Sequence, residues 1–177
     1  SNLVAAGISS LAAVALFWHL APRLSSRTGK IVMGVVIVGI VAVGGTYYVL
    51  TLSYGAEVLL SGLAVGSLAV AILAINNLRD IEGDRAAEKR TIAARIGEKA
   101  ARVEIAVAVF APFVMVVLLA GLLADRRLLI ALASLPLAAA LLWMVAASRG
   151  AQLNRCLAVA GLLQWAFSLL FLLAVML

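Results

Sequence analysis

Residues 58–91 read VLLSGLAVGSLAVAILAINNLRDIEGDRAAEKRT. The first part, Val58–Ile75, is an uninterrupted apolar run close to the roughly 20 residues that a helix needs to cross a bilayer. The second part is densely charged. This abrupt change predicts a helix that leaves the hydrocarbon core and enters a polar phase near Asn76.

The composition of the whole chain agrees with a membrane location. Of 177 residues, 66% are hydrophobic and 12% are charged, and the mean hydropathy is +1.18. Soluble domains are nearer 45–50% apolar and about 25% charged, so a soluble domain is excluded. Disorder and a coiled coil are excluded as well. Because Cys156 is the single cysteine, a disulfide scaffold and a cysteine-built metal site are excluded too.

Apolar runs near 20 residues recur along the chain and predict six spans. These are Leu3–Leu20, Ile31–Leu52, Val58–Ile75, Val103–Leu123, Leu128–Ala147 and Cys156–Leu177. Unpaired backbone groups are not tolerated in lipid, and the runs lack the alternation of a barrel strand. The sequence therefore predicts an all-α integral membrane protein, a multi-helix transmembrane bundle.

The distribution of charge predicts the orientation of this bundle. All of the 14 Lys and Arg residues except Arg126 and Arg127 lie in the first, third and fifth connections. The positive-inside rule places these three connections in the cytoplasm. The formal charge of +6 is therefore assigned to membrane topology, with the lipid bilayer as partner and no nucleic acid.

The charged third connection contains a candidate metal site. If the preceding helix continues through it, Asn77, Asp80 and Asp84 share one face. Two carboxylates and an amide oxygen suit Mg²⁺, which prefers oxygen ligands and commonly bridges to phosphate. Basic residues that could bind the same phosphates follow at Arg85, Lys89 and Arg90.

A solvated helix face whose acids pair with neighbouring bases would also explain this segment. The amides of Asn76 and Asn77 favour a functional site, because two amides at the end of an apolar helix are costly without partners. Tyr47 and Tyr48 lie near the end of the second span, where tyrosines mark either a lipid interface or a pocket.

The pattern NNxRDIExDRxAxKRT over residues 76–91, with Ala94-Arg95-Ile96-Gly97 after it, resembles the second aspartate-rich motif of the UbiA-type intramembrane prenyltransferases. Within that superfamily it is most similar to the 1,4-dihydroxy-2-naphthoate polyprenyltransferases of menaquinone biosynthesis. Thr46-Tyr47-Tyr48, Leu153-Asn154 and Gln164 resemble the same branch.

The resemblance implies a nine-helix fold in which residues 1–177 form one domain with a cytoplasmic charged segment, 77–102. It implies Mg²⁺-dependent transfer of a polyprenyl group from its diphosphate to an aromatic acceptor, 1,4-dihydroxy-2-naphthoate, to form a demethylmenaquinone in a bacterial plasma membrane. Asp80 and Asp84, assisted by Asn77, would bind Mg²⁺. The substrates would be bound by Asn76, Asn77, Arg85, Lys89, Arg90, Tyr47 and Tyr48.

The family's first aspartate-rich motif, of the form NDxxDxxxD, has no match, since no acid precedes Glu57. The cytoplasmic first connection places the N-terminus on the outer side. Six spans with this orientation fit a chain that begins at the family's fourth helix. The chain is then the C-terminal two-thirds of a longer protein or a shortened relative.

Other functions remain open at this point. The acceptor could be another aromatic such as 4-hydroxybenzoate, or the chain could be a non-catalytic fragment that binds lipid diphosphate. A CDP-alcohol phosphotransferase would need an Asp-Gly pair, which this chain lacks. A transporter would more often bury ionisable groups at mid-membrane, whereas the acids here lie at span ends or in connections.

Overall fold

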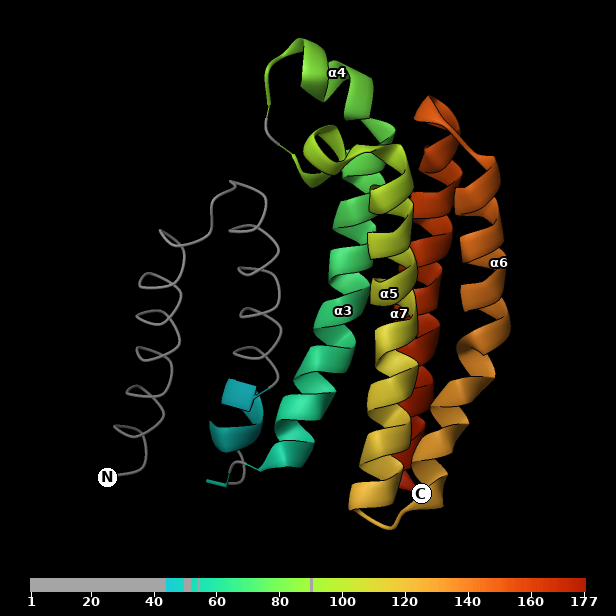
Figure 1. Ribbon diagram of the computed structural model, residues 1–177. Helices are drawn as coiled ribbons and strands as arrows, with labels where there is room; N and C mark the ends of the chain where they lie inside the picture. The colour runs from blue at the N-terminus through green and yellow to red at the C-terminus, as the bar shows by residue number, and fades with distance from the viewer. Residues whose placement is uncertain (1–43, 50–51, 54, 90) are drawn as a thin grey trace.

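A computed structural model of the protein describes residues 44–49, 52–53, 55–89 and 91–177, which are helical apart from short connections and contain no strand (Figure 1). The elements follow one another as α3 (Ala56–Arg79), α4 (Ile81–Ala86), α5 (Ile92–Leu122), the 3₁₀ helix η2 (Arg126–Ser134), α6 (Leu135–Ala147), the 3₁₀ turn η3 (Gly150–Gln152) and α7 (Leu153–Met176). The all-α prediction is confirmed.

Four of the predicted spans are confirmed as helices long and apolar enough to cross a membrane. They comprise Ala56–Arg79, Ile92–Leu122, Arg126–Ala147 and Gly150–Met176. A helix of 24 residues such as α3 is about 36 Å long, enough for the roughly 30 Å hydrocarbon core. The predicted span Leu3–Leu20 lies outside the described residues, and only residues 44–49 of Ile31–Leu52 are described in one helical piece.

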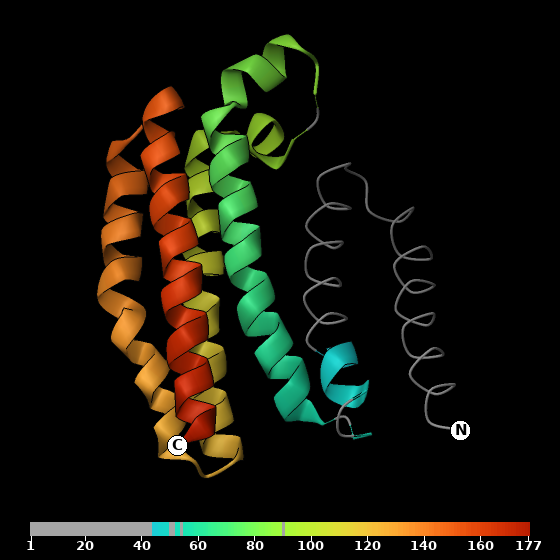
Figure 2. The same cartoon turned by 180° about the vertical axis from the view of Figure 1, so that it is seen from behind.

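The four long helices lie side by side, and both views place α4 beyond the end of α3 and the start of α5 beside that end (Figures 1 and 2). We call this end of the bundle, formed by residues 76–89, 91–102 and 148–155, the charged end. The α3 helix packs mainly against α5 and α7. Small residues on its buried face, Gly62, Ala64, Gly66, Ala71 and Ala74, allow this close approach.

Aromatic side chains fill the space between α5 and α7. Phe113 and Phe167 meet edge to face, with ring centroids 5.8 Å apart, and Phe167 stacks on Phe171 at 6.0 Å. Cys156 is fully buried near the start of α7. Trp143 and Trp165 are 74% and 70% exposed, as expected for side chains that face lipid.

Gly97 divides α5 into two parts. Its φ of 86° and ψ of 167° are non-helical and lie in a region that is essentially restricted to glycine. The short part before Gly97 begins at Ile92. The side chain of Thr91, just before it, accepts a hydrogen bond from the backbone N–H of Ala94 and so caps the helix. The chain therefore turns at the charged end before it enters the long part of α5.

Candidate functional site at the charged end

The helix of the third span does not continue unbroken through the charged segment, as the shared face of Asn77, Asp80 and Asp84 would require. It ends at Arg79, and α4 begins at Ile81 after Asp80 adopts φ −95° and ψ 10°. Backbone hydrogen bonds still join the two helices through Asp80, because the Asp80 N–H donates to the Asn76 carbonyl at 3.2 Å and the Asp84 N–H donates to the Asp80 carbonyl at 2.8 Å. Asp80 therefore lies at a bend, where a side chain leaves the regular helical pattern.

The Asp80 carboxylate is held by the neighbouring guanidinium. Arg79 Nε donates to Oδ1 and Arg79 Nη2 to Oδ2, both at 2.7 Å. These hydrogen bonds are the main reason why the pKa of Asp80 lies below its usual range. The third nitrogen of the fork, Nη1, donates to Asn154 Oδ1 of α7 at 3.0 Å. One guanidinium thus joins α3 to α7 at the charged end.

Asp84 is buried, and its partner is a lysine that the predicted site includes. Its side chain is 9% exposed, and Lys89 Nζ lies 3.4 Å from Oδ1. The chain reverses between them, with Glu88 at φ 51°, and the Lys89 N–H donates to the Asp84 carbonyl at 2.8 Å. Both candidate metal-binding carboxylates are thus neutralised by a nearby cation.

The other predicted site residues at this end differ in how far they are buried. Asn76 and Asn77 are half-buried in the last turn of α3. Arg85 is exposed, and its Nε donates to the Ala94 carbonyl at 3.3 Å, which fastens α4 to the start of α5. Arg90 lies outside the described residues.

Tyr47 and Tyr48 are not brought near the aspartates. They belong to the helical residues 44–49, which lie beside the start of α3 at the end of the bundle away from α4 (Figures 1 and 2). The chain must cross the whole length of α3, about 36 Å, before it reaches Asp80. Tyr47 is 38% exposed and Tyr48 is half-buried.

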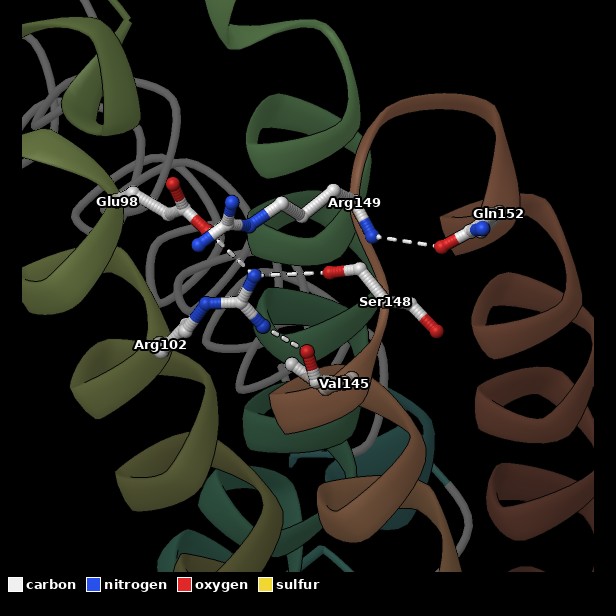
Figure 3. Close-up of polar contacts among 6 residues, drawn as sticks. All are labelled: Glu98, Arg102, Val145, Ser148, Arg149 and Gln152. Carbon is white, nitrogen blue, oxygen red and sulfur yellow. Dashed lines mark hydrogen bonds and ion pairs between the residues drawn. The ribbon is translucent and has the colours of Figure 1, made fainter.

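The sequence analysis missed a second polar cluster at the charged end (Figure 3). Arg102 Nη2 donates to Glu98 Oε1 at 2.6 Å and to the Ser148 carbonyl at 2.8 Å, and Nη1 donates to the Val145 carbonyl. Arg149 Nε lies 3.3 Å from the same Glu98 oxygen. These contacts tie the start of α5 to the end of α6, across a separation in sequence that no local pattern reveals.

A pocket of about 270 Å³ lies between the Arg79–Asp80 pair and the cluster of Glu98, Arg102 and Arg149. It is lined by Leu78, Arg79, Ile81, Glu82, Glu98, Arg102, Arg149, Gly150 and Leu153. Its three guanidinium groups are opposed by the carboxylates of Glu82, Glu98 and the adjacent Asp80. This balance of charge fits a structural cluster better than a second anion site.

The donors around Asp80 and Asp84 suit a hard cation. Over the described ranges, no group of three or more His, Cys, Asp or Glu side chains could hold a metal. The available donors are two carboxylates with the amide oxygen of Asn77, all within the end of α3 and α4. Oxygen donors of this kind fit Mg²⁺, which keeps several waters and binds through one or two carboxylates.

The fold and the charged end together define a helical membrane protein with carboxylates and cations gathered at one end of an apolar bundle. The chain belongs to the UbiA prenyltransferase family, which it matches over residues 1–171. No solved structure matches the chain.

Three curated relatives, each named 1,4-dihydroxy-2-naphthoate octaprenyltransferase, are similar to parts of the chain. The protein from Haemophilus influenzae is 48% identical over 68 residues, 38% of this chain and 22% of the relative. The Escherichia coli protein is 36% identical over 100 residues, which are 56% of this chain and 32% of the relative. The Mycobacterium tuberculosis protein is 42% identical over 67 residues, which are 38% of this chain and 23% of the relative. The chain thus spans less than a third of each relative.

Proposed function

We propose that the protein transfers a polyprenyl group from polyprenyl diphosphate to an aromatic acceptor in a Mg²⁺-dependent reaction. The observation that carries this proposal is the pair of carboxylates, Asp80 bound to Arg79 and Asp84 bound to Lys89, at the charged end of an apolar bundle whose chain belongs to the UbiA family. The names of the three relatives favour 1,4-dihydroxy-2-naphthoate as the acceptor, so that the product would be a demethylmenaquinone.

The reaction requires the allylic C–O bond of the prenyl diphosphate to ionise, which leaves a cation and a departing diphosphate. Asp80, Asp84 and Asn77 would hold Mg²⁺, which would supply Lewis-acid stabilisation of the departing diphosphate. Lys89, Arg90 and Arg85 would bind the phosphate oxygens directly. Lys89 is 63% exposed on its side chain, so it can leave Asp84 for a phosphate without unfolding the segment.

The apolar bundle would protect the reactive cation from water, since a site closed by hydrocarbon excludes competing hydrolysis. The cation forms beside the diphosphate, at the charged end. We therefore assign Tyr47 and Tyr48, which lie toward the other end, to contacts with the long prenyl chain. Asn76 and Asn77 would complete the polar lining below the diphosphate.

We also propose that residues 1–177 act as one domain in a bacterial plasma membrane. In that orientation the charged segment 77–102 faces the cytoplasm, because the basic connections are retained on that side. Both substrates would then meet at the cytoplasmic surface. The diphosphate group of the prenyl donor would lie in the polar phase, and its prenyl chain would lie in the bundle.

The test is prenyl transfer by the protein expressed from its whole natural reading frame and purified in detergent, with and without Mg²⁺. Asp84→Asn keeps the shape of a buried side chain but removes its charge. We expect transfer to dihydroxynaphthoate to fall by more than about 100-fold, beyond the 10–100-fold typical of residues that only support a metal ligand.

Glu82→Gln makes the same chemical change at an exposed position in the same helix, α4, and serves as the control. It should retain activity within a few-fold. Transfer to 4-hydroxybenzoate in preference to dihydroxynaphthoate would overturn the assigned acceptor. Diphosphate binding without transfer to any acceptor would overturn the enzymatic proposal.

A further inference from the structure

The Arg79 guanidinium makes two different kinds of contact at once. Two of its nitrogens donate hydrogen bonds to the two carboxylate oxygens of Asp80, each at 2.7 Å, and the third donates to Asn154 Oδ1 at 3.0 Å. Asn154 belongs to α7 and lies 75 residues further along the chain. A cation on α3 is therefore held in place by a neutral amide on another helix.

This arrangement fixes the plane of the Asp80 carboxylate. A carboxylate has about four lone-pair sites on its two oxygens, and a two-pronged fork occupies one on each oxygen. The Asp80 side chain remains 42% exposed, so its other edge can still be reached by a ligand. The orientation of that free edge depends on the position of the guanidinium, which in turn depends on Asn154.

A second fork in the same chain provides an internal comparison. Arg127 Nε and Nη2 bond Asp125 at 2.9 Å and 2.7 Å, but the hydrogen bonds of that pair run between the two residues themselves. Exposed ion pairs of this kind contribute little to stability. The link to another helix therefore distinguishes Arg79 from an ordinary surface pair.

We infer that Asn154 and Arg79 are positioning residues that orient Asp80 for a divalent cation, Asn154 acting through Arg79. This inference rests on the proposed function, in which Asp80 is a metal ligand. Carboxylates that bind metals are themselves held by hydrogen bonds, and loss of such a partner weakens metal affinity by about 10–100-fold.

Binding of Mn²⁺ to the purified protein, followed by electron paramagnetic resonance, tests the inference without relying on turnover. Mn²⁺ accepts the same carboxylate ligands as Mg²⁺. Asn154→Ala and Arg79→Lys both keep the positive charge near Asp80 but break the chain of contacts. We expect each to raise the Kd for Mn²⁺ by about tenfold or more.

Two further variants make the result specific. Asn154→Asp keeps an acceptor oxygen for Arg79 and should bind Mn²⁺ no more weakly than the natural protein. Arg127→Lys breaks the comparison fork and should leave the Kd unchanged. If Asn154→Ala and Arg79→Lys bind like the natural protein, or if Asn154→Asp is as weak as Asn154→Ala, the inference is overturned. Thermal unfolding in detergent identifies any variant that has lost its fold, and the remaining variants then decide.

Asp80→Asn separates this inference from the function on which it rests. Loss of Mn²⁺ binding in Asp80→Asn together with unchanged binding in Asn154→Ala would reject only the positioning role. Unchanged binding in Asp80→Asn, or no Mn²⁺ binding by the natural protein, would reject the proposed metal site and the positioning role together.

Discussion

Asp125, in the connection between α5 and η2, has a pKa below its usual range. The side chain of Arg127 is the main cause, followed by the Arg127 backbone N–H, which donates to Asp125 Oδ1 at 3.0 Å. Because protonation is harder in the folded state, the ion pair stabilises the fold above the ordinary Asp pKa of about 3.9. Its contribution is lost as the pH falls through the lower folded-state pKa.

We therefore expect Asp125→Asn to lower the thermal unfolding midpoint in detergent at pH 5–7, by an amount that shrinks as the pH falls below about 4. The amide still accepts the backbone hydrogen bond, so the difference isolates the charge. In an Arg127→Gln background the same substitution should have a smaller pH-dependent effect, because only the backbone N–H of residue 127 then still lowers the pKa of Asp125. A difference that does not change with pH would contradict this account.

At the scale of single residues, the sequence placed Asp80, Asp84 and Lys89 just beyond the third span but did not indicate how they pair. Asp84 with Lys89 could be anticipated, since the two lie five positions apart in one segment. The contact between Arg79 and Asn154 could not, because it depends on how α3 and α7 pack. Local spacing contains no information on a pairing across 75 residues.

At the scale of elements, Gly97 sets the boundary between the surface turn and the membrane-crossing part of α5. A Cβ at this position would meet no atom within 4 Å, so any cost of a larger residue comes from the backbone. Gly97→Ala should lower the free energy of unfolding by about 1–3 kcal/mol. Denaturation in mixed micelles measures this change.

Gly121→Ala is the matched control in the same helix. It too has open space around its Cβ position, and its φ lies outside the positive range. An alanine there should be neutral or stabilise the helix by up to about 1 kcal/mol. Equal effects of the two substitutions would mean that the Gly97 conformation is not strained for alanine.

Hydropathy predicted the four described spans because the cost of burying polar groups in lipid dominates every other local preference. It placed the helix ends less well. The α5 helix begins at Ile92 rather than Val103, and α3 runs past Ile75 to Arg79. These turns are polar and are held by caps and pairs, such as the Thr91 cap, which hydropathy does not register.

At the scale of the whole molecule, Arg102 joins the start of α5 to the end of α6. Its side chain is 20% exposed and serves one carboxylate and two backbone carbonyls. Arg102→Met should destabilise the fold by about 1.5–3 kcal/mol, the range for hydrogen bonds to charged groups. It should also speed proteolysis in the connection around Ser148.

Arg149→Met tests whether the position in the cluster matters. Arg149 contacts the same Glu98 oxygen but is 83% exposed, so its loss should cost less than about 1 kcal/mol. If the two substitutions were equally harmful, the cluster would act through its net charge rather than through the carbonyls that Arg102 holds.

The single cysteine can report local opening of the charged end through its rate of alkylation. The Cys156 thiol is fully buried two positions after Asn154, so a thiol reagent cannot reach it while α7 stays packed. Its alkylation rate therefore reports how often the start of α7 separates from its neighbours. If alkylation is slow in the natural protein and faster in a variant whose α7 packs less tightly, its rate measures how often the start of α7 opens. No label has to be introduced for this measurement.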